Sequence, residues 1–270
     1  MKISVITVTY NSGEKLKATI ASVIAQSFHD FEIIIKDGLS GDNSLELIPE
    51  DSRVSIYRCK DAGIYDAMNQ AIQYVSGEYI LFLNSGDVLH NPDVFKRVEE
   101  FIESDFEKRE LYYGDVFVST RNGVIPAPEH LDNFTLITRT ICHQCLFFSK
   151  KIFEKRFYNY REFGLASDMG LYVACIKKDG IKAKHMPFII SDYEGGGASE
   201  TVETKKQIIK AKKKIMKTYF TKAECRKIVI RKIIQLKYLK EWLSCSRVFF
   251  RLYEGIASVL SKKIIDNCIK

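Results

Sequence analysis

Carboxylate and amide side chains follow four segments whose apolar, β-branched composition is typical of buried strands. They are Asn11 after residues 3–9, Asp37 after residues 31–35, Asp61 after residues 54–57 and Asp87 after residues 79–83. Each side chain alone is typical of a polar turn. Several carboxylates that converge on one cleft instead favour a site for a ligand or a metal ion.

Strand-like and helix-like segments alternate through the first hundred residues, with apolar residues at helical spacing over residues 16–24, 67–75 and 94–102. This alternation predicts a three-layer α/β fold with a mostly parallel central sheet. Right-handed crossovers then place the carboxyl ends of the strands at one edge, where such sheets bind ligands. We expect Asn11 or Ser12 to cap the first of these helices and Asn91, before Pro92, to cap the third.

Three further polar residues in the second half of the chain have more than one interpretation. Asp115 follows a strand-like segment and either touches a substrate or closes a turn. His143 precedes a strand-like run and is either a ligand-binding or a hydrogen-bonded structural histidine. Asp168 starts a helix-like pattern that runs to Ile176, a position typical of an N-cap.

The composition is that of a chain with ample apolar core, 46% hydrophobic over 270 residues. A strand pattern begins directly after Met1 and Lys2, so we expect no signal peptide, and no apolar run has the length of a membrane span. Seven scattered cysteines favour a reducing, cytoplasmic location. Neither a G-x-G-x-x-G motif after the first strand nor a P-loop is present, which argues against a dinucleotide dehydrogenase.

The net charge of +7 is unevenly distributed. Residues 205–270 hold 19 lysines and arginines and four acidic residues, a net charge of +15, which leaves −8 on residues 1–204. The basic segment also has apolar and aromatic residues at helical spacing, which is typical of a helix that binds an anionic membrane surface. A helical cap on the sheet is the alternative, and no nucleic-acid-binding motif accompanies the charge.

Four motifs in the first hundred residues together resemble family 2 glycosyltransferases. They are S-V-I-T-V-T-Y-N at residues 4–11, D-G-L-S-G-D-N-S at 37–44, D-A-G-I-Y-D-A-M-N at 61–69 and G-E-Y-I-L-F-L-N-S-G-D at 77–87. The resemblance implies a GT-A fold that binds a nucleotide-diphospho-sugar. It also implies a nucleotide-sugar pocket in which Asp37 holds the base, together with Asn11, Asp61 and Asn69.

The same resemblance implies that Asp87 binds a divalent cation, Mn²⁺ or Mg²⁺, which bridges the donor diphosphate. Both ions accept carboxylate oxygens together with substrate phosphates. The loop departs from the family pattern, because many members have aspartate at the positions of Asn84 and Gly86. We therefore expect a metal dependence weaker than is usual in the family.

Segments after residue 111 resemble the acceptor half of these enzymes. Residues 167–171 are similar to the family's [ES]-D-x-x-L motif, which implies that Asp168 is the catalytic base. His143 lies in a segment that resembles H-Q-x-x-F-F, so it is a candidate for contact with the diphosphate or the acceptor. Asp115 is a second candidate for such a contact, with turn closure as its alternative. The G-G-x-S resemblance at residues 196–199 implies a flap over the bound sugar, or a linker.

The resemblance implies an inverting transferase that uses a nucleotide sugar, with a UDP-sugar favoured, in cell-surface polysaccharide synthesis. We expect residues 1–204 to form the GT-A domain, with a nucleotide-sugar half (1–110) and an acceptor half (111–204), and residues 205–270 to form a basic amphipathic helical extension. The basic segment favours a lipid-linked oligosaccharide acceptor at the inner face of the plasma membrane. A sugar nucleotidyltransferase and a degenerate membrane-bound scaffold are the alternatives.

Overall fold

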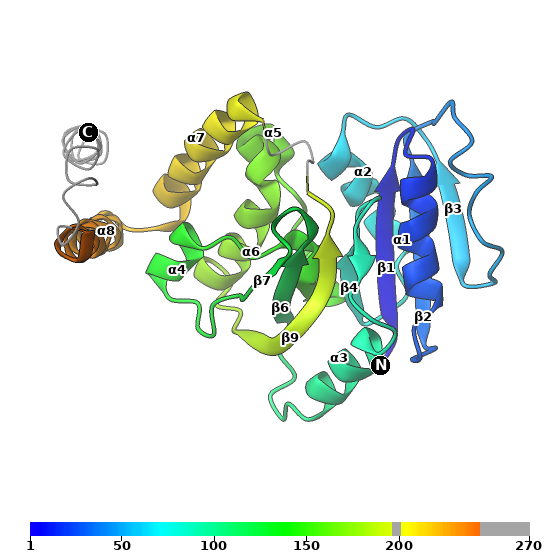
Figure 1. The fold of residues 1–270 in the computed structure, drawn as a ribbon, viewed down its shortest axis with the longest axis horizontal. Coiled ribbons are helices and arrows are strands. Elements are labelled where there is room, and N and C mark those ends of the chain that lie inside the picture. Colours follow the sequence, from blue (N-terminus) through cyan, green and yellow to red (C-terminus); the bar gives the residue numbers. More distant parts are fainter. Residues whose placement is uncertain (196–200, 244–270) are drawn as a thin grey trace.

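Four parallel strands form one half of the central sheet (Figure 1). In the computed structural model, which describes residues 1–195 and 201–243, β1 lies between β2 and β4, and β3 pairs with the other side of β2. The strands are β1 (Ile3–Thr9), β2 (Phe31–Asp37), β3 (Val54–Arg58) and β4 (Tyr79–Phe82). Thr9 and Asp37 are register partners, so the loops that follow β1 and β2 start at the same edge of the sheet.

The second half of the sheet mixes strand directions. An antiparallel strand, β8, joins β4 to β6, which in turn pairs in parallel with the long strand β9. Two short strands complete the sheet, β5 beside β9 and β7 beside β6. Their bounds are β5 (Val88–Leu89), β6 (Leu111–Val118), β7 (Gly123–Ile125), β8 (Leu146–Ser149) and β9 (Ala183–Tyr193). The predicted α/β fold with a mostly parallel sheet is confirmed.

Helices cover both faces of the sheet, and the alternation of side chains along each strand gives each face its own core. Ile3 and Val5 of β1 pack with α1 and α3, whereas Ile6 and Val8 pack with α2 and α6. The six helices of the first 180 residues are α1 (Glu14–Ile24), α2 (Ile64–Ala71), α3 (Val94–Glu103), α4 (Asn133–Thr138), α5 (Tyr160–Phe163) and α6 (Ser167–Lys177).

The predicted N-caps of α1 and α3 are wrong. Helix α1 begins after Gly13, and the hydroxyl of Ser44 accepts hydrogen bonds from the N–H groups of Ser12 and Gly13, at 2.9 and 2.7 Å. Helix α3 begins two residues after Pro92, because the Asn91 side chain accepts from the N–H of Asp93 in a turn that precedes the helix. Gly13 and Asp93 occupy the N-cap positions of α1 and α3, and neither makes a side-chain cap hydrogen bond.

Up to residue 243, where the described residues end, the basic segment lies in two helices, α7 (Val202–Tyr219) and α8 (Lys222–Leu243), as its periodicity predicted. They are separated by a capping box in which Thr221 and Glu224 each accept a hydrogen bond from the N–H of the other. Buried Ile215 and Ile228 anchor the two helices to the body. Figure 1 shows α7 beside α5 and α6, with α8 farther out. In the described part of the chain, no helix combines the length and apolarity of a membrane span.

Glu32 at the start of β2 ties three segments together away from the predicted site. Its carboxylate accepts hydrogen bonds from the hydroxyls of Ser4 and Ser76, from the N–H of Ser76 and from the ammonium of Lys2. Burial alone would raise the pKa of Glu32, but these hydrogen bonds outweigh burial and lower the pKa to about 2. The ionised carboxylate therefore stabilises the folded chain.

Replacing Glu32 with glutamine tests this network. Since the folded-state pKa lies below the ordinary value, the stabilisation is complete above about pH 4.5 and is lost as the pH falls toward 2. We expect Glu32→Gln to lower the free energy of unfolding by about 2 kcal/mol at pH 7, and by much less at pH 3. Urea unfolding at pH 7 and pH 3 measures this change in the free energy of unfolding, and Glu46→Gln, at an exposed position, is the control. A loss of equal size at both pH values would contradict the account.

Candidate functional site

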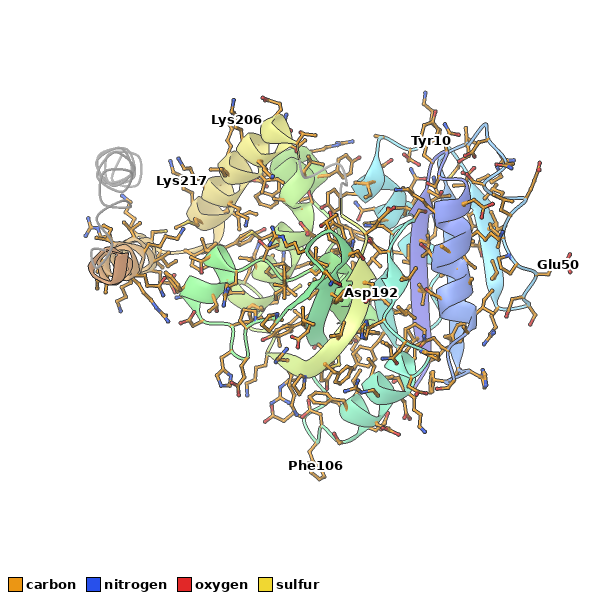
Figure 2. All side chains as sticks on the ribbon, in the orientation of Figure 1. Tyr10, Glu50, Phe106, Asp192, Lys206 and Lys217 are labelled. Carbon is orange, nitrogen blue, oxygen red and sulfur yellow. The ribbon has the colours of Figure 1, made fainter. Side chains whose placement is uncertain are left out.

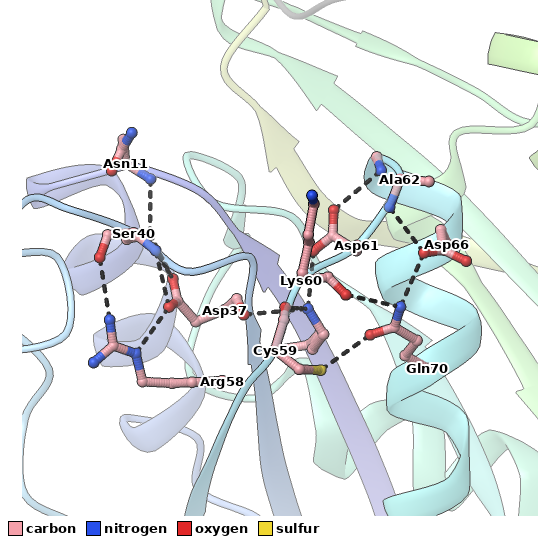
Figure 3. Close-up of polar contacts among 12 residues, drawn as sticks. Asn11, Asp37, Ser40, Arg58, Cys59, Lys60, Asp61, Ala62, Asp66 and Gln70 are labelled. Carbon is pink, nitrogen blue, oxygen red and sulfur yellow. Dashed lines mark hydrogen bonds and ion pairs between the residues drawn. The ribbon is translucent and has the colours of Figure 1, made fainter.

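Asp37, the last residue of β2, is fully buried and its carboxylate organises the loop that follows (Figure 3). Ser40 donates to it twice, from its hydroxyl at 2.5 Å and from its N–H at 3.0 Å. The guanidinium of Arg58, at the end of β3, donates to the same carboxylate at 3.1 Å. A carboxylate without water needs such partners, so the charge of Asp37 fixes the shape of this loop.

Asn11 and Asp61 join Asp37 at this edge through loop contacts. The N–H of Asn11 donates to the hydroxyl of Ser40 at 2.9 Å, and its side-chain oxygen accepts from the N–H of Gly41 at 2.8 Å. Asp61 accepts from the ammonium of Lys36, a fully buried side chain, at 2.9 Å. Three of the four residues predicted for the nucleotide-sugar pocket therefore lie close together.

Close packing at this edge explains why residue 38 is a glycine. A Cβ on Gly38 would lie 2.9 Å from a carboxylate oxygen of Asp61, so only glycine fits without displacing that side chain. Lys36 was not singled out from the sequence. The sequence did contain a sign of its role, because Lys36 is a cation that directly follows the buried apolar residues of β2 and precedes Asp37.

A cavity of about 520 Å³ lies beyond the end of β4, and both halves of the chain line it. Its polar lining includes Asn84, Ser85, Asp87, Thr140, His143, Gln144, Asp168, Glu194 and Lys212. Three predicted site residues, Asp87, His143 and Asp168, are thus brought together. Asn11, Asp37, Asp61, Asn69 and Asp115 do not line this cavity.

Asp87 is a buried carboxylate without a cationic partner. Burial raises the pKa of Asp87 to about 6, and hydrogen bonds from the Gln144 side chain and the Glu194 N–H oppose that rise only in part. Within residues 1–195 and 201–243, no lysine or arginine forms an ion pair with it; the nearby Lys15 pairs with the side chain of Glu194 at 2.6 Å. The negative charge of Asp87 is therefore under-compensated.

Two neighbours of Asp87 define the rest of this wall. The side-chain oxygen of Asn84 is buried and has no hydrogen-bond partner among the described residues. Gly86 has a φ of 103°, and a Cβ there would lie 2.6 Å from a carboxylate oxygen of Glu194. An acceptor oxygen without a donor and a buried carboxylate thus belong to the same short loop. Oxygen atoms of this kind are the ligands that Mg²⁺ and Mn²⁺ accept, so these residues fit a divalent cation.

Asp168 also lines this cavity, from the first turn of α6. The predicted N-cap role is wrong: Ala166 occupies that position and makes no side-chain cap. The carboxylate is half-buried and lies at the positive end of the helix dipole. Burial and the charge of Asp168 together raise the pKa of the neighbouring Tyr65 hydroxyl well above 10.

His143 and Gln144 lie in a short 3-10 helix (His143–Cys145) and also line the cavity. His143 stacks on Phe82 and its Nε2 lies 2.8 Å from the hydroxyl of Tyr158. Burial lowers the pKa of His143, which keeps the ring neutral at pH 7. Gln144 donates to Asp87, a role missed from the sequence although the residue is part of H-Q-x-x-F-F.

Two predicted site residues make structural contacts elsewhere. Asn69 uses both ends of its amide on the backbone of Tyr158, at 2.9 and 3.0 Å. Asp115 accepts from the N–H of Ala127 and pairs with His185 Nε2, each at 2.8 Å. The predicted flap at residues 196–199 lies outside the described residues.

The model of the family described as "Glycosyl transferase family 2" matches residues 4–157, which contain the loops of Asp37, Asp61 and Asp87. The chain belongs to this family. The resemblance predicted from four motifs is confirmed, and it makes the protein a glycosyltransferase.

Two relatives illustrate the similarity of this family 2 glycosyltransferase to named enzymes. It is 32% identical over 209 residues to a "PGL/p-HBAD biosynthesis glycosyltransferase" of Mycobacterium tuberculosis, which covers 75% of this chain and 80% of that one. It is 25% identical over 199 residues to the "UDP-Glc:alpha-D-GlcNAc-diphosphoundecaprenol beta-1,3-glucosyltransferase WfgD" of Escherichia coli, covering 71% and 76%.

Solved structures share the fold at low sequence identity. TarS of S. aureus (residues 1–349), solved in complex with UDP-GlcNAc, aligns with a TM-score of 0.63 at 16% identity, over 93% of this chain and 76% of that one. The mannosyltransferase PcManGT of Pyrobaculum calidifontis, solved with GDP-Man and Mn²⁺, aligns with a TM-score of 0.56 at 12% identity, over 96% and 86%. These alignments confirm the predicted GT-A fold.

Proposed function

We propose that this glycosyltransferase moves a sugar from a nucleotide-diphospho-sugar to a hydroxyl group of a glycan acceptor, with inversion at the transferred carbon. The observation that carries the proposal is one cavity whose lining includes two aspartates in contrasting surroundings, buried Asp87 and half-buried Asp168. Such contrast is what a transferase needs, because one carboxylate serves the leaving group and the other serves the nucleophile. The UDP-GlcNAc complex of TarS supports a UDP-sugar as the donor.

The donor nucleotide is assigned to the edge formed by Asn11, Asp37 and Asp61. In this proposal, Asp37 and its loop hold the base, and the exposed backbone around Gly41 and Gly63 lies nearby. Asn69 contributes from a distance, since its amide positions the backbone of Tyr158.

Asp168 acts as the general base. The acceptor hydroxyl gives its proton to the Asp168 carboxylate while its oxygen bonds to the anomeric carbon, and the bond to the nucleoside diphosphate breaks. His143 is neutral and bonded to Tyr158, so it shapes the cavity wall and leaves proton removal to Asp168.

Asp87 and Asn84 would hold a divalent cation, as the under-compensated charge of Asp87 and the unpaired side-chain oxygen of Asn84 suggest. Bound there, the cation would offset the negative charge that develops on the departing diphosphate. Hydrogen bonds from the Gln144 side chain and the Glu194 N–H fix the orientation of the Asp87 carboxylate. The Mn²⁺ complex of PcManGT supports this assignment.

The acceptor is proposed to be a lipid-linked oligosaccharide at the cytoplasmic face of the plasma membrane, in cell-surface polysaccharide synthesis. WfgD, named for a diphosphoundecaprenol acceptor, supports the lipid. Ile230, Ile233 and Ile234 of α8 are 43–55% exposed on a helix that also exposes Lys227. Apolar and basic side chains on one helix are suited to an anionic bilayer surface.

Asp168→Asn tests the general base. General base catalysis contributes about 10²–10⁴-fold, so we expect sugar transfer to fall by about that factor while UDP affinity is unchanged. Mass spectrometry with a panel of nucleotide sugars and α-D-GlcNAc-diphosphoundecaprenol measures transfer, and calorimetry measures UDP binding. Asp30→Asn, at an exposed position, is the control. Full activity of Asp168→Asn would rule out this base, and a wild type that neither transfers sugar nor binds UDP would favour the scaffold alternative.

The cation is tested by calorimetry with UDP in Mn²⁺ and in EDTA. We expect wild-type affinity for UDP to fall about tenfold or more in EDTA, because the diphosphate then meets the Asp87 charge directly. Asp87→Asn should lose the Mn²⁺ dependence, and Asn84→Asp should strengthen it by adding a carboxylate. Equal UDP affinity of the wild type in Mn²⁺ and in EDTA would contradict the metal assignment.

Membrane binding is tested by flotation of the full chain with vesicles of phosphatidylglycerol. We expect the double variant Ile230→Ser, Ile234→Ser to float several-fold less than the wild type, because it loses apolar area that enters the interface. Phe106→Ser removes an exposed apolar side chain on another part of the surface and is the control (Figure 2). Flotation of the double variant at the wild-type level would contradict the role of α8.

A further inference from the structure

One face of α7 forms part of the wall of the cavity. Ile208 and Lys212, one helical turn apart, line it together with Asp168. Other lysines of the same helix are exposed, and Figure 2 shows Lys206 and Lys217 pointing away from the body. Lys212 therefore lines the cavity, whereas the other lysines of α7 are exposed on the surface.

Lys212 is fixed within the cavity by a neutral partner. Its ammonium group donates to the hydroxyl of Thr140, another lining residue, at 2.8 Å. It forms no ion pair within 4.0 Å with a carboxylate of the described chain. Burial lowers the pKa of Lys212, while the charge of Asp168 acts in the opposite direction. The hydrogen bond leaves ammonium protons available for a ligand.

The charges around the cavity leave a place for an anion beside Lys212. The lining contains three carboxylates, those of Asp87, Asp168 and Glu194, and Lys212 is the one lysine or arginine among the described lining residues. Lys212 and Asp168 face the same space without touching, so a substrate between them can contact both. A lysine binds phosphate as a point charge, and diphosphate is the leaving group of the proposed donor class.

We propose that Lys212 is a phosphate-binding residue of the cavity, held in place by Thr140. Its ammonium binds a phosphate group of a substrate whose reacting hydroxyl or sugar lies beside Asp168. Two sources supply such a group, the diphosphate of a lipid-linked acceptor and the diphosphate of the donor. This inference rests on the proposed transferase function and adds α7 to the substrate-binding elements.

The experiment compares full-length Lys212→Met, Lys212→Arg and Thr140→Val with the wild type. Lys213→Met, an exposed lysine at the next position of α7, is the matched control. Calorimetry measures UDP affinity in Mn²⁺, which reports the donor source. The KM for a lipid-diphosphate glycan, set beside the KM for an alkyl glycoside of the same sugar without phosphate, reports the acceptor source. Thermal unfolding checks that each variant is folded.

We expect Lys212→Met to weaken phosphate-dependent binding about 10- to 100-fold, as loss of a charge-assisted hydrogen bond would. Lys212→Arg should retain most of the binding and Thr140→Val should lose part of it, so the test stands even if Lys212→Met fails to fold. A raised KM for the lipid diphosphate alone identifies the acceptor as the source, and weakened UDP binding identifies the donor.

Unchanged UDP affinity and unchanged KM in Lys212→Met would overturn the inference. Equal losses for the acceptors with and without phosphate would also overturn it if UDP affinity is unchanged. A wild type that neither binds UDP nor transfers sugar contradicts the proposed function instead. Loss of binding in Lys213→Met as large as in Lys212→Met would also overturn it, because the effect would then come from the charge of α7 as a whole.

Discussion

The end of β2 carries two buried charges of opposite sign, and the geometry of this edge of the sheet depends on how they are satisfied. Lys36 and Asp37 are adjacent and fully buried, and strand alternation turns their side chains to opposite faces of the sheet. Each ion would cost several kcal/mol to bury alone. Lys36 therefore requires Asp61, and Asp37 requires Ser40 and Arg58, so that the loops after β2 and β3 fold around these charges.

The sequence was enough to predict the position of a residue where the local pattern marks the end of a strand and the topology fixes the edge at which that strand ends. Apolar runs marked the parallel strands, and the rule that their carboxyl ends share an edge was enough to bring Asn11, Asp37 and Asp61 together. The motifs added roles for Asp87 and Asp168, and both residues line one cavity. These residues lie at the ends of regular elements, where position along the chain determines position in space.

The residues that were missed depend on tertiary packing. Gln144 reaches Asp87 from a 3-10 helix, and Glu194 does so from the end of β9, and neither contact has a local signature. Lys212 is one of many lysines in α7, and the rotation of that helix against the body, which periodicity does not fix, decides which lysine turns inward. The predicted cap of α1 failed for the same reason, since Ser44, from another loop, binds the N–H groups of Ser12 and Gly13 before the helix.

Gly86 and Glu194 occupy the space that a second carboxylate of the Asp87 loop would need. The loop has a glycine where many family members have aspartate, and the carboxylate of Glu194, from the far end of β9, fills the gap above it. The two positions are therefore sterically coupled. An aspartate introduced at Gly86 alone would meet both a left-handed backbone and an occupied site. Residues 86 and 194, from two segments far apart in the sequence, therefore jointly determine how many acidic groups lie beside Asp87. A larger side chain at position 86 would displace the carboxylate of Glu194.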